Sequence, residues 1–292
     1  MKLALLLLAG SGVWWVADAQ AREPPLPPAA SAPGPLEEHL AALREFLPAG
    51  EFHLVVSRPF VVIGDGERRA VERSAERTVG WAVTLLKESF FDAEPAGYLD
   101  VWLFQDEESY ERHTRAFFGR RPHTPFGFYS PEHRALIMNI ATGGGTLVHE
   151  LVHPFVRADF PACPAWLNEG LGSLFEQCGV DDEGRIVGRT NWRLGGLQKA
   201  IRAGEVPPFA RLLSTGDAKF YDQDPGTNYA QARYLCYYLQ ERGLLRRFYR
   251  EFRAAQASDP TWLLTLRRVL GTDDLELFQL EWSKFVLELR FP

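Results

Sequence analysis

Cysteine and methionine are both scarce in this chain. Its 292 residues include only 3 cysteines and 2 methionines. An odd number of cysteines excludes complete internal disulfide pairing, and the spacing of Cys163, Cys178 and Cys236 matches neither a catalytic nor a metal-binding signature. Cys163 and Cys178 flank a predicted helix, which makes a bridge between them geometrically unfavourable, whereas a disulfide that includes Cys236 remains open. We interpret the cysteines as small buried apolar residues.

An excess of positive charge is also lacking. The formal net charge is -6, and the lysines and arginines are scattered along the chain. This distribution argues against nucleic acid as a partner. The hydrophobic fraction of 46% and the charged fraction of 24% are those of a folded globular protein.

Beyond the first 21 residues, no apolar run is long enough to span a bilayer. Lys2 is followed by an apolar stretch over residues 3–16 and by small residues at 19–21. This order is typical of a secretory signal peptide over residues 1–21. The alternative, an uncleaved anchor, is disfavoured because a bilayer span needs about 20 apolar residues. We therefore predict an exported protein, periplasmic or secreted, without a stable membrane span after cleavage.

The rest of the chain divides into a tether and one domain. Residues 22–36 are rich in proline and alanine, which predicts an extended tether. The domain covers residues 37–292, with an α/β part at 37–145 and a helical part at 146–292. In the first part we predict strands at 52–63, 98–104, 127–129 and 135–140, and helices at 36–47, 67–91 and 109–118. Beyond Pro161 we predict helices at 165–176, 192–203, 209–213, 229–242, 244–255, 262–270 and 275–289, with almost no strand. The fold class is thus α+β, with a small mixed sheet first and a mostly helical second half.

A metal-binding motif lies at the seam between the two parts. Residues 149–153 read H-E-L-V-H, directly after a run of glycines. On a helix, residues four apart lie about 40° apart around the axis and roughly 6 Å apart along it. His149 and His153 can therefore hold one metal ion from the same side, and Glu150 can take a proton from a water molecule beside it.

A catalytic zinc site needs a third protein ligand and one open position. One candidate is Asp159, but Val156 occupies the position where related spacings have a turn-forming glycine, so a solvated loop acid is the favoured interpretation of Asp159. The other is Glu169, in the stretch W-L-N-E-G-L at residues 166–171, which begins an apolar helix after two prolines. We predict Glu169 as the third ligand; the alternative is an acid on a helix surface.

The two motifs together resemble those of the gluzincin zinc metallopeptidases, and more closely those of the bacterial peptidase MA-like group. The resemblance is specific over residues 127–176 and weaker through the helical tail. It implies a zincin-like fold with one Zn²⁺ per chain, held by His149, His153 and Glu169. It further implies an exported metallopeptidase that hydrolyses peptide bonds of a peptide or protein substrate, with Glu150 as the general base that assists attack by zinc-bound water.

The chain departs from the family pattern at two positions. Pro154 directly follows His153, so we expect the helix to bend there or to end one turn early. Ser173 stands where some gluzincins have an aspartate that holds a metal-bound histidine, so this support must come from another residue.

Two further expectations concern the substrate. The resemblance suggests that a tyrosine or histidine of the helical part stabilises the oxyanion, and Tyr229 is our first choice. Residues 134–140 could form an edge strand that pairs with an extended peptide, unless neighbouring strands cover them.

The alternative function is a catalytically silent, zincin-fold binding or scaffold protein of the cell envelope. The presence of Glu150 favours an enzyme, because a purely structural zinc site would not require it. A third possibility is that the motif is accidental and that no metal binds.

Overall fold

The computed structural model describes residues 36–222 and 225–291. The predicted signal peptide (1–21) lies outside these residues, as does the predicted tether (22–36) except for Leu36, which begins the first helix. In the described ranges, none of the helices combines the length and the apolar character that a bilayer crossing requires.

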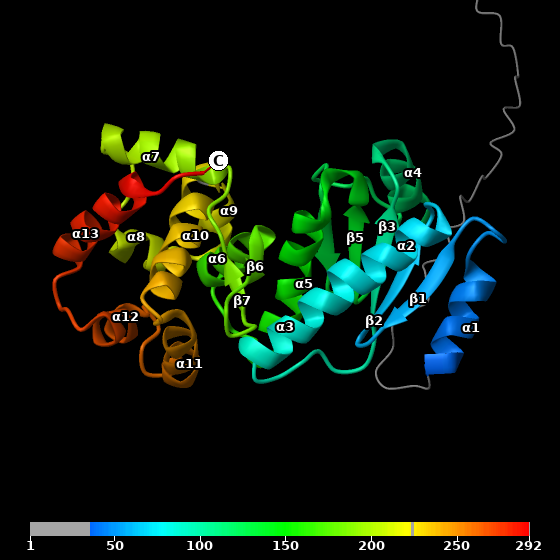
Figure 1. The fold of residues 1–292 in the computed structure, drawn as a ribbon, viewed down its shortest axis with the longest axis horizontal. Coiled ribbons are helices and arrows are strands. Elements are labelled where there is room, and N and C mark those ends of the chain that lie inside the picture. Colours follow the sequence, from blue (N-terminus) through cyan, green and yellow to red (C-terminus); the bar gives the residue numbers. More distant parts are fainter. Residues whose placement is uncertain (1–35, 223–224, 292) are drawn as a thin grey trace, which may run out of the picture.

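A mixed five-stranded sheet forms the centre of the N-terminal part (Figure 1). Its strands, in spatial order, are β1 (His53–Ser57), β2 (Phe60–Gly64), β3 (Leu99–Phe104), β5 (Ala135–Asn139) and β4 (Gly127–Ser130). The inner strands β2, β3 and β5 run parallel, whereas β1 and β4 pair with their neighbours in the antiparallel direction. Strand β4 therefore forms one edge of the sheet.

Helices cover both faces of the sheet. Side chains of a strand alternate between its faces, and in β3 Trp102 belongs to one buried cluster while Val101 and Leu103 belong to the other. The helices α1 (Leu36–Phe46) and α4 (Glu107–Phe118) pack on the first of these faces. The second face is covered by α5 (Gly144–Asp159) and by a long helical segment made of α2 (Arg68–Ser74), the π-helical η1 (Ala75–Gly80) and α3 (Trp81–Ser89). Burial on both faces accounts for the nearly continuous apolar character of the inner strands.

The C-terminal part consists of helices and one short hairpin (Figure 1). The 3-10 turn η2 (Ile140–Thr142) leads from the sheet into α5. After α5 come α6 (Ala165–Glu176), β6 (Cys178–Val180), β7 (Ile186–Gly188), α7 (Arg193–Ala203), α8 (Phe209–Ser214), α9 (Asp217–Asp222), α10 (Pro225–Glu241), α11 (Leu245–Ala255), α12 (Leu263–Leu270) and α13 (Leu275–Glu288).

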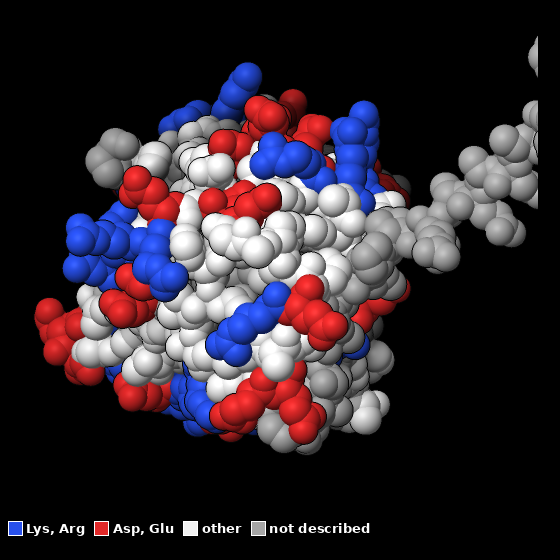
Figure 2. All heavy atoms as spheres, turned by 90° about the vertical axis from the view of Figure 1, so that its right-hand side faces the viewer, with Lys and Arg blue, Asp and Glu red and all other residues white. Residues whose placement is uncertain are grey.

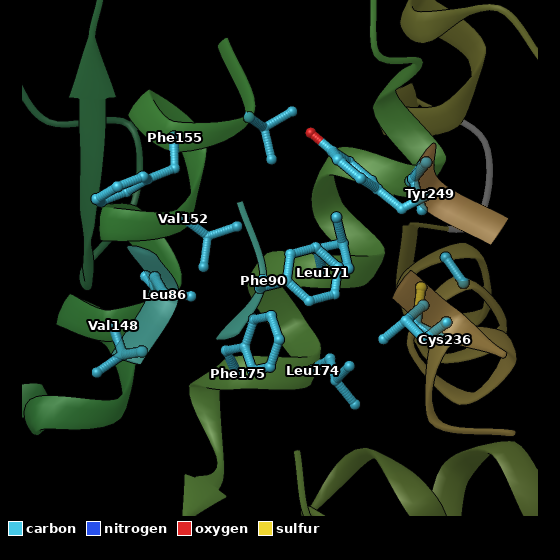
Figure 3. Packing of buried hydrophobic residues seen from close by; sticks show 14 of the residues in the cluster. Leu86, Phe90, Val148, Val152, Phe155, Leu171, Leu174, Phe175, Cys236 and Tyr249 are labelled. Carbon is cyan, nitrogen blue, oxygen red and sulfur yellow. The ribbon is translucent and has the colours of Figure 1, made fainter. Parts of the chain in front are cut away.

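One apolar cluster continues from the sheet into the helical part (Figure 3). In this cluster Val152 of α5 and Leu171 and Phe175 of α6 are buried together with Tyr249 of α11. Phe90, just after α3, lies with its ring 5.5 Å from that of Phe175 and 5.3 Å from that of Tyr249. Each such buried side chain contributes roughly 1.5–3 kcal/mol to the free energy of unfolding. This shared core holds α5 and α6 against each other.

Side chains of both charges are interspersed on the described part of the face at the right of Figure 1 (Figure 2). On α4, Arg115 lies 2.9 Å from Glu111, and Arg112 lies 3.5 Å from Glu108. Opposite charges one helical turn apart stabilise a helix slightly.

The predicted α+β class with a small mixed sheet is confirmed. The prediction of one strand at 52–63 is wrong, because the chain reverses at Arg58 and Pro59 and the segment forms the hairpin β1–β2. The hairpin β6–β7 and helix α9 were not predicted. Both hairpin strands are only three residues long, and such short elements carry little periodicity.

Candidate metal centre

Helix α5 places two histidines on one side, one helical turn apart. The ring centroids of His149 and His153 are 5.0 Å apart, with an angle of 76° between the ring planes. The helix continues through Pro154 to Asp159. Of the two outcomes expected at this proline, a bend or an early end of the helix, the early end is therefore wrong. Pro154 is buried together with Phe155 in the core, and we attribute the continuation of the helix to this packing.

Helix α6 brings Glu169 to the same two rings. Its Oε2 atom lies 3.2 Å from His149 Nε2 and 4.0 Å from His153 Nε2. The residue is 7% exposed, so the alternative of an acid on a helix surface is wrong. Burial raises the pKa of Glu169, but the charge of His153 and the hydrogen bond with His149 outweigh burial and lower this pKa to about 2. The carboxylate therefore stays ionised.

Glu150 lies beside this pair of helices and completes a compact group. Its Oε2 atom is 3.8 Å from His153 Nε2. One ligand atom each of His149, Glu150 and His153 lies within 4.8 Å of the others, in an arrangement that could hold a metal ion. Because Glu169 approaches from the second helix, the centre contains two carboxylates, and only Glu169 has an oxygen within 4.0 Å of both rings.

Asn168 orients the second histidine, and the sequence reasoning missed it. The Nδ1 atom of His153 donates a hydrogen bond to Asn168 Oδ1 over 3.0 Å. With Nδ1 engaged in this way, Nε2 is the nitrogen left to face Glu169. Asn168 thus supplies the kind of support that Ser173 does not. The available signal was its place directly before Glu169 in the W-L-N-E-G-L stretch.

Gly172 gives His149 room to approach α6, which the sequence reasoning also missed. A Cβ atom at position 172 would lie 3.0 Å from Nε2 of His149 and within 3.2 Å of two further ring atoms. Any other residue would therefore push the imidazole away from Glu169. A glycine inside an apolar helix costs about 1 kcal/mol relative to alanine, so its presence there was a usable signal.

Asp159 is not part of this group. It lies at the end of α5, where its side chain is 2% exposed and forms an ion pair with Arg253 of α11. The interpretation of Asp159 as a solvated loop acid is therefore wrong. Arg253 also contacts Asp92 over 2.9 Å, and the three residues connect α11 to both α5 and the segment after α3.

The histidines and glutamates line a cleft of about 850 Å³. The cleft is also lined by Phe126 and by the β4 residues Gly127, Phe128 and Tyr129. The expectation of an edge strand at 134–140 is wrong, because β5 is hydrogen-bonded between β3 and β4. The edge strand beside the centre is β4 instead.

Two tyrosines close the helical side of the cleft. The hydroxyl of Tyr221, on α9, donates a hydrogen bond to Glu169 Oε1 over 2.9 Å. Tyr229, on α10, also lines the cleft and hydrogen-bonds Glu169. Burial raises the pKa of both hydroxyls and the charge of Glu169 raises it further, so both are neutral donors at physiological pH. Tyr221 was not predicted, because the contact joins residues far apart in the sequence.

The remaining histidines and the cysteines lie outside this group. His39 lies 2.7 Å from Asp100, His133 lies 2.9 Å from Ser130 and His113 lies 3.7 Å from Asp65. The cysteines Cys163, Cys178 and Cys236 are free. Cys236 is fully buried, and Cys163 lines the cleft.

The donor set fits a zinc ion. Two imidazoles and one carboxylate, with a fourth position open, are the ligands of many catalytic zinc sites. With zinc–ligand bonds of about 2.1 Å, tetrahedral geometry places the ligand atoms roughly 3.4 Å apart. The distances of 3.2 Å and 4.0 Å from Glu169 Oε2 to the two Nε2 atoms are close to this value. No family model and no curated protein matches the chain.

Proposed function

We propose that this protein is an exported, zinc-dependent metallopeptidase of the gluzincin type, with a zincin-like fold. The observation that carries the proposal is the approach of Glu169 from α6 to both histidines of α5, with Glu150 beside them. These residues line a cleft of about 850 Å³. The proposal of export rests on the sequence of residues 1–21 alone.

His149, His153 and Glu169 would hold the zinc ion. Bound Zn²⁺ supplies a Lewis acid that lowers the pKa of water and polarises the carbonyl of the substrate. Glu150 is the general base: it takes a proton from the attacking water and passes it to the leaving amine. Asn168 keeps the ring of His153 in its orientation through the hydrogen bond to Nδ1.

Tyr229 is our candidate for the donor to the oxygen that gains negative charge. Tyr229 lines the same cleft as Glu150 and Glu169, and its hydroxyl hydrogen-bonds Glu169. When its hydrogen bond to Glu169 is released, this neutral hydroxyl can donate its proton in a hydrogen bond to a developing oxyanion. Among the described residues β4 is an edge strand that pairs with β5 alone, and it lines the cleft, so an extended peptide can add there as a further strand.

The proposal is tested with a peptide library and the variant Glu150→Gln. We expect the purified protein to cleave peptides and a chelator to abolish cleavage. Glu150→Gln should retain zinc but lose activity by about 10²-fold to 10⁴-fold, the usual contribution of a general base. Glu132→Gln, at an exposed position in the turn between β4 and β5, is the matched control and should behave as wild type.

Two results would contradict the proposal. Unchanged cleavage by Glu150→Gln would show that Glu150 is not the base. A wild-type protein that holds stoichiometric zinc yet cleaves no peptide would instead be the silent binding protein.

A further inference from the structure

A second cavity adjoins the metal cleft on the helical side. It has a volume of about 600 Å³ and is lined by residues of α7 and α10, among them Gly196, Leu197 and Ala230. Trp192, Arg193 and Tyr229 line both this cavity and the metal cleft. The two spaces therefore adjoin at Tyr229, whose hydroxyl hydrogen-bonds Glu169.

Exposed aromatic side chains gather around this region. Trp192 is 63% exposed, whereas the other tryptophans in the described part of the chain are buried or half-buried. Phe126 and Tyr221, which are 52% and 43% exposed, line the metal cleft as well. Large aromatic rings left in water next to a cleft mark a ligand-binding surface. Their position indicates a ligand that extends beyond the metal centre itself.

The lining of the second cavity favours an uncharged occupant. Among the described residues that line the second cavity, one is charged, namely Arg193. Its guanidinium group lies 3.4 Å from the carboxylate of Glu176 and 4.0 Å from the centre of the Trp192 ring. Arg193 thus already has a carboxylate as its ion-pair partner, although the two atoms form no hydrogen bond. The buried Leu197 and Ala230 present apolar surface.

We propose that this second cavity binds a large apolar side chain, aromatic or leucine-like, that lies next to the scissile bond of the substrate. This inference rests on the proposed function and names the substrate class of the same site. The volume of the second cavity lies within the range of about 300–1,000 Å³ found for small-molecule pockets. An aromatic side chain would pack against Trp192 and leave water, which is the source of the selectivity.

Two adjacent glycines of α7 allow a matched test. A Cβ atom at Gly195 or at Gly196 would meet nothing within 4 Å, so a side chain can leave the backbone at either position without a clash at its first atom. Gly196 lines the cavity and Gly195 does not. Gly196→Phe therefore places a ring into the cavity, whereas Gly195→Phe makes the same chemical change in the same helix outside it.

The first measurement is binding without turnover. Isothermal titration of the Glu150→Gln protein uses two blocked pentapeptides, one of five alanines and one with phenylalanine at its centre. We expect the phenylalanine peptide to bind at least about tenfold more tightly. This preference should persist in Gly195→Phe and fall below about twofold in Gly196→Phe. Equal preference in both glycine variants, or no preference in the starting protein, would overturn the inference.

Two additions keep the result interpretable. Trp192→Ala removes an exposed side chain and should not disturb folding. If Gly196→Phe fails to fold, Trp192→Ala serves as the second variant in which we expect the preference for the phenylalanine peptide to be lost. Cleavage of the same peptides by proteins that retain Glu150 then tests the proposed function separately. A binding preference without any cleavage would refute the peptidase and leave the apolar pocket intact, whereas cleavage without preference would refute only the pocket.

Discussion

The substitution Gly172→Ala should weaken metal binding without weakening the fold. The added Cβ atom would stand 3.0 Å from Nε2 and within 3.2 Å of two other ring atoms of His149. Ordinary contacts between such atoms are longer by a few tenths of an ångström, so the ring must move away from α6. The movement lengthens the 3.2 Å distance between His149 Nε2 and Glu169 Oε2.

Two effects of the substitution oppose each other in the free energy of unfolding. Alanine is more favourable than glycine inside a helix by about 1 kcal/mol, and shifting one buried ring costs a similar amount. The metal-free variant should therefore unfold within about 1 kcal/mol of wild type. Metal affinity depends on the position of the ring and should fall by about tenfold to a hundredfold, as when a ligand loses its orienting contacts.

Two assays separate these effects. Competition with a zinc chelator measures the affinity, and urea unfolding of the metal-free protein measures the stability. Gly195→Ala is the matched control, because a Cβ atom at position 195 meets open space in another helix. If Gly172→Ala binds zinc as tightly as Gly195→Ala does, the reasoning about the position of His149 is refuted.

Three other predictions follow from single contacts. Asn168→Ala should lower zinc affinity by about tenfold or more, because His153 Nδ1 loses its hydrogen-bond acceptor. Asn168→Asp should keep most of the wild-type affinity. Equal zinc affinities of Asn168→Ala and wild type in chelator competition would contradict this prediction. Arg253→Ala leaves the carboxylate of Asp159, 2% exposed, without its partner, and should lower the free energy of unfolding by roughly 3 kcal/mol; a loss under about 1 kcal/mol would show that water replaces the arginine. Hydrogen bonds from arginines of α11 lower the pKa of Asp92 below 3.8, so its ionised form stabilises the fold above that pH and the effect fades as pH falls further. Asp92→Asn should therefore cost less than about 1 kcal/mol at pH 7 and less again at pH 3, and a cost that grows on acidification in urea unfolding would refute the sign.

Local sequence patterns predicted most of the helices near the site. The bounds of α6 were predicted correctly at Ala165–Glu176, because two prolines precede it and its apolar residues recur with helical spacing. The end of α4 was predicted correctly at Phe118, before Gly119 in the left-handed conformation, whereas its start was predicted at Ser109 and lies at Glu107, directly after the capping Asp106. Such signals lie within a few residues of the elements they bound.

Contacts between distant segments could not be predicted in this way. The alternating pattern at 52–63 is the same for one long strand and for two paired strands, so only the pairing of Ser57 with Phe60 reveals the hairpin. Likewise, Tyr221 reaches Glu169 across 52 positions of the chain. The sequence contained the tyrosine and the glutamate but no local pattern that joins them.

The central claim is that His149, His153 and Glu169 hold one metal ion together. The most direct measurement is the zinc content of purified wild-type protein beside that of Glu169→Gln, after both have been equilibrated with the same free zinc concentration. We predict close to one zinc per wild-type chain and a large loss in the variant. Fewer than about 0.2 zinc per wild-type chain, or equal content in both proteins, would contradict the claim.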